Sequence, residues 1–182
     1  ASGVRVSFDG NFRPTLWQRW GGDVQAILHA LFDQADIVFA DYRDIEVILG
    51  QRFTQAGAVE RVDAAAAAAF AAFPRLQWLA CTQRQALSVD HHALGALLLG
   101  REGVRAQAPV RQLTGIIDRI GGGDAFAAGI LHGILSGFDA DATVRFGLAA
   151  GGLKHSIPGD FNPVSEADVL AQMGEERFDV RR

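Results

Sequence analysis

A glycine-rich stretch from Ile116 to Gly137, with the sequence IIDRIGGGDAFAAGILHGILSG, constrains the fold of this chain more than any other segment. It predicts the end of a buried strand, a turn of three glycines and a helix that begins at Asp124 and Ala125. The apolar positions of that helix recur at helical spacing and are Phe126, Ile130 and Ile134, with Leu131 and Leu135 beside them. Gly129 and Gly133 lie four residues apart, so we expect the buried helix face to approach a neighbour closely.

The glycines of the turn, Gly121, Gly122 and Gly123, carry no β-carbon, so consecutive backbone N–H groups can point toward one place. That place lies at the positive end of the helix dipole, where an anion binds. Asp124 follows directly, and its carboxylate would repel a resting phosphate. It suits a general base, because an enzyme that moves a phosphoryl group to an alcohol needs donors for the transferred group and an acceptor for the hydroxyl proton.

A structural interpretation of the same residues stays open. Asp124 could cap the helix, and the glycines could form a tight turn without binding a ligand. Four residues cannot separate the two interpretations, because motifs this short also match by accident.

Composition limits the other possibilities. The 182 residues are 49% hydrophobic, which fits one globular α/β or α+β domain, and the net charge of −4 without a basic block argues against a nucleic-acid surface. Cys81 is the single cysteine, so no internal disulfide can form and a reducing compartment is expected. No apolar run approaches the roughly 20 residues of a membrane helix, and no signal peptide is expected, so we predict a cytoplasmic protein that does not bind membranes.

The segment DRIGGGDAFAAG resembles the second signature of the ribokinase, or pfkB, family of carbohydrate kinases, DTxGAGDxFxxG. Arg119 replaces the usual Thr and Gly122 the usual Ala, and both departures resemble bacterial 2-keto-3-deoxygluconate kinases. The resemblance implies an α/β, three-layer, Rossmann-like ribokinase fold. It also implies that Asp124 is the general base and that the amides of Gly121, Gly122 and Gly123 form an anion hole.

Members of that family are considerably longer than this chain. The resemblance therefore implies that residues 1–182 are the C-terminal, nucleotide-binding portion of a single pfkB-type kinase domain, without the N-terminal half and the lid.

The segment DGNFRPTLW follows an expected strand at Val4–Phe8 and resembles the DxNxRxxLW run of 2-keto-3-deoxygluconate kinases. By that resemblance Arg13 would bind the carboxylate of a sugar acid, for which a planar fork of donors is well shaped. Asn11 would lie near the transferred phosphate of ATP. Without the resemblance, a polar loop that ends at Pro14 and leaves Arg13 exposed is the preferred interpretation.

Three more segments are assigned by resemblance. Asp41 and Asp44 stand where the family has an NxxE motif linked to Mg²⁺, although a helix-capping pair is the alternative. Thr82 and Arg84 resemble a TxR variant placed near the phosphates of ATP, with a surface turn as the alternative. Gly151 would lie beside the adenine, and the loop HSIPGDFN would bring Asp160 to the substrate.

The remaining periodicity predicts ordinary elements and no metal cluster of histidines. His91 and His92 are expected to be exposed, residues 86–89 to be a hairpin partner, and residues 94–99 to lead through a loop and short strands toward Val110. The expected helices are Asp23–Gln34, a helix within 45–50, Ala64–Ala72, a helix from Asp139 or Asp141 to Lys154, and Glu166–Met173. The first has Val24, Ile27, Leu28 and Leu31 on its apolar side. Asp63 would cap the helix of alanines, and Gly151 and Gly152 would interrupt the helix that ends at Lys154. The expected strands are Asp36–Ala40 and Trp78–Cys81.

These observations predict an ATP-dependent kinase that phosphorylates a hydroxyl of a small sugar acid, 2-keto-3-deoxygluconate above others, with ATP and Mg²⁺ as cofactors. The alternatives are another pfkB-family kinase of the fructose or ribose type, or a nucleotide-binding module without catalysis. A dinucleotide oxidoreductase is disfavoured because GxGxxG is missing. A homo-oligomer stays open.

Overall fold

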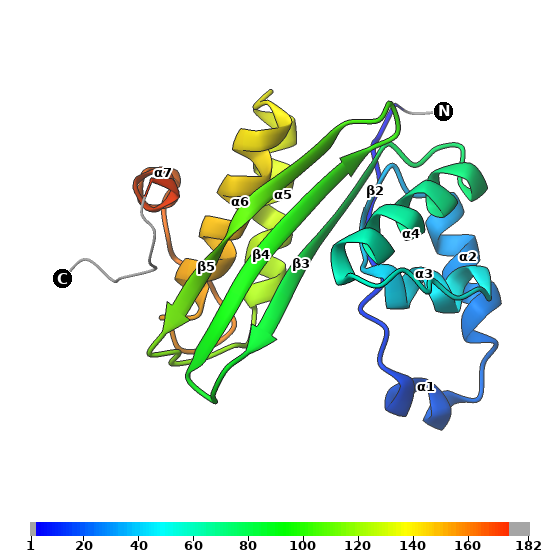
Figure 1. Cartoon of the computed structure of the whole chain (residues 1–182), viewed down its shortest axis with the longest axis horizontal. Helices are drawn as coiled ribbons and strands as arrows, with labels where there is room; N and C mark the ends of the chain where they lie inside the picture. The colour runs from blue at the N-terminus through cyan, green and yellow to red at the C-terminus, as the bar shows by residue number, and fades with distance from the viewer. Residues whose placement is uncertain (1–2, 175–182) are drawn as a thin grey trace. The chain divides into compact units, whose positions relative to one another are not determined.

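The computed structural model describes residues 3–174, and its elements are shown in Figure 1. The helices are α1 (Pro14–Trp20), α2 (Val24–Asp33), α3 (Tyr42–Leu49), α4 (Ala58–Ala72), α5 (Gly122–Leu135), α6 (Ala140–Lys154) and α7 (Glu166–Met173). The strands are β1 (Ser7–Asp9), β2 (Ile37–Phe39), β3 (Trp78–Ala86), β4 (His91–Gly100) and β5 (Arg105–Thr114). The expected frayed tail lies largely outside the described residues.

The five strands form one mixed sheet in the order β1-β2-β3-β4-β5. β1, β2 and the start of β3 are parallel neighbours, whereas β3, β4 and β5 follow one another through short turns and alternate in direction (Figure 1). Helices and strands of this kind confirm the α/β class that the sequence predicted. The described chain falls into two compact units: the first extends to Cys81 and includes Leu99–Val104, and the second contains Thr82–Leu98 and the residues from Arg105 onward.

The core of the first unit is built around two aromatic rings. Phe32 on α2 and Phe73 after α4 are fully buried, with ring centroids 5.7 Å apart. The guanidinium group of Arg101 closes the end of α4: it donates to the carbonyl of Leu76 at 2.7 Å, bonds the carbonyl of Phe73 and lies over the ring of Phe70. These contacts bind Arg101 to the end of α4 and to the turn after it, where the carbonyl of Phe73 also accepts the N–H of Leu76 at 3.1 Å.

Several expectations for the first unit need correction. Residues 14–20 form a helix that was not predicted. Pro14 is compatible with its first turn, and Gly21 ends it in the left-handed conformation. α4 begins at Ala58, so Asp63 lies inside the helix and does not cap it. Ile27 and Leu31 are exposed rather than buried.

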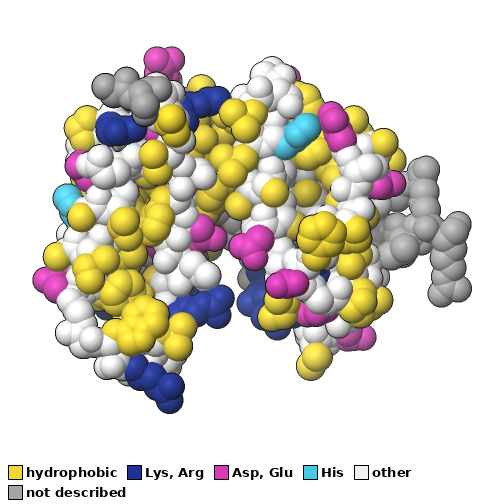
Figure 2. Space-filling model, turned by 180° about the vertical axis from the view of Figure 1, so that it is seen from behind, with side chains coloured by type: hydrophobic (Ala, Val, Ile, Leu, Met, Phe, Trp, Pro, Cys, Tyr) yellow, Lys and Arg dark blue, Asp and Glu magenta, His cyan; other side chains and the backbone are white. Residues whose placement is uncertain are grey.

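Exposed apolar side chains gather on α1 and α2. Figure 2 shows hydrophobic side chains at the lower left, where these helices lie, and the exposed ones are Leu16, Trp20, Ile27 and Leu31. None of the described helices is both long and apolar enough to cross a membrane.

The second unit contains two long strands that the sequence did not predict. β4 is buried along almost its whole length, and the turn before it is closed by N–H groups of Leu87 and Ser88, which donate to the carbonyl of His91. The hairpin partner of β3 is therefore β4, not residues 86–89. His92 is 1% exposed rather than solvent-exposed, because it belongs to this buried strand. A continuous apolar run cannot by itself distinguish a buried strand from other buried segments.

α5 and α6 pack closely against each other, as the glycine spacing predicted. A β-carbon built on Gly129 would lie 2.8 Å from the α-carbon of Gly147, and one on Gly133 would lie 2.9 Å from the side chain of Thr143. Only glycine therefore permits this helix separation without movement of the backbone. Gly151 and Gly152 do not interrupt α6, which remains helical to Lys154.

Candidate anion-binding site

The turn before α5 differs from its expected form. β5 ends at Thr114, and both Ile117 and Ile120 are exposed, so no buried strand leads into the turn. α5 begins at Gly122 rather than Asp124, and Gly121 is its N-cap with φ of 76°. A β-carbon on Gly121 would lie 2.3 Å from the carbonyl oxygen of Asp160. Both the left-handed backbone and this contact require glycine.

The first turn of α5 keeps N–H groups that no side chain satisfies. α2, α3, α6 and α7 each have an Asp or Ser side chain that accepts an N–H of the first turn, whereas the glycine at the N-cap of α5 offers none. Gly122 donates to the carbonyl of Arg119 at 3.3 Å, so the expected set of three amides is partly occupied. Gly123 lies in the first turn and has no intrahelical acceptor. The glycine turn can therefore accept an anion chiefly through the amides that remain.

Asp124 is the third helical residue of α5 and is exposed. The same position is occupied by Asp44 in α3 and by Asp168 in α7, and both carboxylates turn back to accept the N–H of their N-cap residue at 2.8 Å. Within residues 3–174, the carboxylate of Asp124 makes no such bond and no ion pair. The helix-capping interpretation of Asp124 is therefore not what the structure shows.

The loop after α6 holds the turn in place. The carbonyl of His155 accepts the N–H groups of Ile117 at 2.9 Å and Asp118 at 3.2 Å. The carboxylate of Asp118 in turn accepts the N–H groups of Ile120 and Gly159, both at 2.9 Å. These bonds, first the one from Ile120 and then the one from Gly159, lower the pKa of Asp118.

Two buried histidines of the second unit are affected by positively charged side chains. Burial lowers the pKa of His92, and the nearby charges of Arg84 and Arg119 lower it further. Burial also lowers the pKa of His155, where Arg84 and Lys154 contribute in the same direction. Arg84 therefore acts electrostatically on two buried histidines of the second unit, and its role near the phosphates of ATP stays a prediction. Thr82 lies two residues earlier on β3 and is exposed.

Gly151 and Asp160 also contact the turn. A β-carbon on Gly151 would lie 3.2 Å from both the carbonyl oxygen of Gly122 and the β-carbon of Phe126, so its small size serves the packing of α6 against the start of α5. Asp160 is exposed and touches Gly121 through its main chain. Roles of the two residues in binding adenine and substrate remain predictions.

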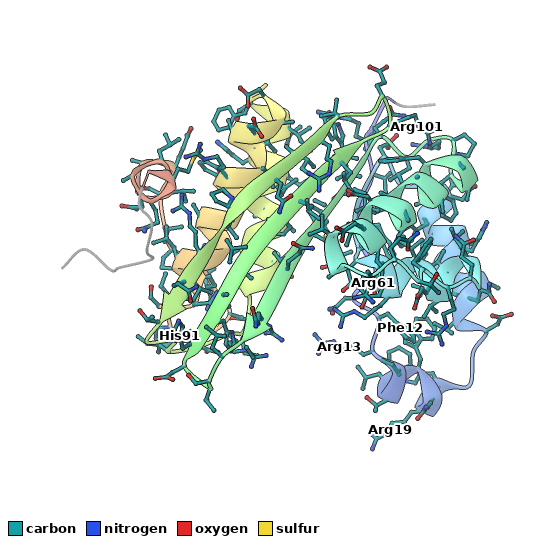
Figure 3. The ribbon with its side chains drawn as sticks, in the orientation of Figure 1. Phe12, Arg13, Arg19, Arg61, His91 and Arg101 are labelled. Atoms are coloured by element: carbon teal, nitrogen blue, oxygen red, sulfur yellow. The ribbon has the colours of Figure 1, made fainter. Side chains whose placement is uncertain are left out.

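Asn11 and Arg13 belong to the first unit. Asn11 has a positive φ of 36°, and its N–H donates to the carboxylate of Asp9 at 2.9 Å. Arg13 is the N-cap residue of α1 and is exposed, and Figure 3 shows its side chain extending from the start of that helix. Its guanidinium group is thus accessible to an acidic ligand.

Asp41 and Asp44 form a capping box at the start of α3. Asp41 accepts the N–H of Arg43 at 2.7 Å and pairs with its guanidinium group, while Asp44 accepts the N–H of Asp41. Burial is the main cause that raises the pKa of Asp44 to about 6. Among the described residues no group of three or more His, Cys, Asp or Glu side chains could hold a metal. The pair therefore has the geometry of the capping alternative.

No role was predicted from the sequence for three residues beside the turn: Asp118, which lies in the signature segment, Lys154 and His155. Lys154 is fully buried, and its ammonium group donates to the carbonyl of Ile157 at 2.8 Å. Only Asp118 had a local signal, because an aspartate just before a glycine turn often accepts nearby backbone N–H groups. Lys154 and His155 had none.

Comparisons with known proteins relate nearly the whole chain to one family of enzymes. A family model described as pfkB family carbohydrate kinase matches residues 1–167. The 2-dehydro-3-deoxygluconokinase of Bacillus subtilis (strain 168) is 26% identical over 180 residues, which are 93% of this chain and 46% of that protein. The crystal structure of a PfkB family carbohydrate kinase from Listeria grayi DSM 20601 is 31% identical with a TM-score of 0.83, and the match covers 95% of this chain and 51% of that one.

A second solved structure, the 2-dehydro-3-deoxygluconokinase of Thermotoga maritima, is 26% identical with a TM-score of 0.80, covering 95% of this chain and 52% of that one. The chain thus spans about half the length of the relatives it matches.

Proposed function

The chain belongs to the pfkB family of carbohydrate kinases, and we propose that it carries the phosphoryl-transfer site of an ATP-dependent sugar kinase. The observation that supports this proposal best is the pairing of an uncapped glycine turn with an exposed carboxylate at Asp124. Donors for a phosphoryl group and an acceptor for a proton then stand at one helix start, as this reaction requires.

In the proposed reaction Asp124 takes the proton of the sugar hydroxyl as the hydroxyl oxygen attacks the γ-phosphorus of ATP. The new oxygen–phosphorus bond forms while the bond from phosphorus to the leaving oxygen of ADP breaks. The amides of Gly121 and Gly123 donate to the equatorial oxygens. The amide of Gly122 joins them when its bond to the carbonyl of Arg119 is released. Arg84 and Arg119 add positive charge around them.

Mg²⁺ would enter with ATP and offset charge between the phosphates. Asp41 and Asp44 fit a direct site poorly, because Asp41 is engaged by Arg43 and one oxygen of Asp44 by the N–H of Asp41. We therefore assign no step of the reaction to a protein-bound metal.

The proposed acceptor is a sugar acid, with 2-keto-3-deoxygluconate as the first candidate. Two matched relatives are named 2-dehydro-3-deoxygluconokinase, and the exposed guanidinium group of Arg13 suits a carboxylate. Asp160 would contact the sugar beside the turn. A fructose-type or ribose-type acceptor is the alternative within the family.

The test is Asp124→Asn in the protein as its gene encodes it, measured by phosphoryl transfer from ATP to 2-keto-3-deoxygluconate. We expect kcat to fall by about 10²- to 10⁴-fold, because the variant cannot accept the proton, while ATP affinity changes little. Asp141→Asn, in the first turn of α6, is the matched control and should retain activity. Near-normal turnover by Asp124→Asn would refute the role of Asp124.

A nucleotide-binding module without catalysis is the second candidate, since the chain spans about half the length of its relatives. ATP binding with no transfer at high sugar concentration would favour it. Transfer by the chain would exclude it.

A further inference from the structure

His155 lies at the C-terminal end of α6, where the buried imidazole makes a fixed contact. Its Nδ1 atom lies 2.7 Å from the carbonyl oxygen of Gly151. Because a carbonyl oxygen can only accept, Nδ1 carries the proton in this bond, which fixes both the tautomer and the orientation of the ring. The ring is thus held by its own helix rather than by a ligand.

The edge of this ring packs directly against the glycine turn. A β-carbon built on Gly122 would lie 2.8 Å from Cε1 of His155, and 3.3 Å and 3.4 Å from its two ring nitrogens. Carbon atoms do not approach this closely without movement, so the ring occupies space that any other residue at position 122 would need.

The main chain of His155 contacts the same turn at its other end. Its carbonyl accepts the N–H groups of Ile117 and Asp118, which precede the glycines. One residue therefore holds the turn on both sides, through its carbonyl at residues 117–118 and through its ring at Gly122.

Two residues near His155 in sequence make further bonds in the same region. Lys154 bonds the carbonyl of Ile157, and Gly159 donates to the carboxylate of Asp118. The loop that follows α6 is therefore bonded to itself and to the turn.

We propose that His155 is a positioning residue for the anion-binding turn, and that Gly122 is glycine because the imidazole ring fills the place of its side chain. The ring acts through Gly122: it sets the directions of the N–H groups that receive the phosphoryl oxygens. This inference rests on the proposed function, because it assigns a cause to the geometry of the same turn.

The test is a double-mutant cycle of Gly122→Ala and His155→Ala in the 182-residue chain, with ATP as the titrated ligand. Gly122→Ala should weaken ATP binding about tenfold or more, because the new methyl group meets the ring. His155→Ala should weaken binding several-fold by releasing the turn. The double variant should bind ATP about as well as His155→Ala alone. Purely additive losses would overturn the proposal.

Two further variants separate positioning from folding. His155→Asn keeps a donor for the carbonyl of Gly151 but loses the ring, so it should behave like His155→Ala, and wild-type affinity would overturn the role of the ring. His132→Ala is the matched control: this partly buried ring stacks on Phe146, at a centroid distance of 4.9 Å, and should leave ATP affinity within about twofold.

Amide resonances of the turn decide the question independently of ATP. In ¹⁵N spectra without ligand, the signals of Gly121 and Gly123 should move in both His155 variants but not in His132→Ala. Unmoved signals would overturn the proposal even if ATP binds. If the wild-type chain binds no ATP, the proposed nucleotide function fails. The role of His155 is then still decided by these signals and by the unfolding midpoints of wild type, Gly122→Ala, His155→Ala and the double variant.

Discussion

The carboxylate of Asp118 accepts the N–H of Gly159 at 2.9 Å, across 41 residues of sequence. Its other oxygen accepts the N–H of Ile120, so the bond joins the glycine turn to the loop that follows α6. A carboxylate that accepts two backbone N–H groups is more strongly bound than a neutral acceptor. Asp118 therefore fixes the distance between the two segments that surround the proposed anion site.

We expect Asp118→Asn to loosen the turn, because the amide side chain has only one acceptor oxygen and no charge. The pKa of Asp118 is lowered in the folded protein, so its ionised form stabilises the fold at pH values above the ordinary range of an aspartate. This contribution is lost as the pH falls through the lowered pKa. The difference in unfolding free energy between wild type and variant should therefore be present at pH 7 and shrink as the pH falls below the ordinary range of an aspartate.

Asp168→Asn is the control for that measurement. Asp168 also accepts a backbone N–H and also has a lowered pKa, but its partner Ser165 is the N-cap residue of α7 and not part of the turn. Both variants should lose stability at pH 7, whereas only Asp118→Asn should weaken ATP binding. Equal ATP affinity of the two variants would show that Asp118 does not hold the site.

A second prediction concerns the contact of α5 with α6. In Gly129→Ala the new β-carbon would meet the α-carbon of Gly147 and the β-carbon of Ala150, at 2.8 Å and 3.1 Å. Backbone atoms cannot move aside cheaply, so we expect a loss of about 1–3 kcal/mol in unfolding free energy, despite the better helix propensity of alanine. Urea unfolding measures this loss.

Gly123→Ala is the matched substitution in the same helix, since a β-carbon there would meet no atom within 4 Å. It should leave stability unchanged or raise it by up to about 1 kcal/mol. If Gly129→Ala were as stable as Gly123→Ala, the close approach of the two helices would be wrong.

The features of the fold that the sequence predicted correctly depend on residues close together in the chain. Gly129 and Gly133 predicted a close helix contact because their spacing depends only on helix geometry, and the structure confirms it. Asp23 and Ser165 begin their helices as side chains that accept an N–H of the first turn, which a short sequence motif can reveal. The class of the fold followed from such elements.

The features that sequence missed depend on contacts between distant segments. His92 is buried because β4 is buried along nearly its whole length, and no sequence pattern near residue 92 predicts this burial. α5 begins at Gly122 rather than at Asp124, and the left-handed Gly121 before it lies beside the main chain of Asp160, a contact that no nearby residue reveals. Support of the turn by Asp118 and His155 likewise becomes visible only when residues about 40 apart are brought together.

A third prediction concerns the response of stability to acid. The pKa of His92 is lowered by burial and by the charges of Arg84 and Arg119, so the folded state favours the neutral ring. Below about pH 6.5 the unfolded chain binds this proton more readily, and stability is therefore lost as the pH falls. His155 acts in the same direction. We expect His92→Gln to reduce the fall in unfolding free energy between pH 7.5 and pH 5.5.

His91→Gln is the adjacent control, because His91 is partly exposed and bonds Gln112 at 2.7 Å near the start of β4 (Figure 3). The decrease on acidification should remain close to that of wild type in this variant. An identical decrease in wild type and His92→Gln would contradict the assignment to His92.

The last prediction tests the choice of a sugar acid as the acceptor. Arg13 is exposed at the start of α1, and a guanidinium group binds a carboxylate through two parallel hydrogen bonds that a neutral sugar cannot offer. In the protein as its gene encodes it, Arg13→Ala should raise KM for 2-keto-3-deoxygluconate by about tenfold or more, with a much smaller change for a neutral sugar such as fructose. Arg19→Ala, on the same helix, should change neither value. Steady-state kinetics with both sugars measures the difference, and an equal rise for both would remove the reason for proposing an acidic substrate, because the lost interaction would then not depend on the carboxylate.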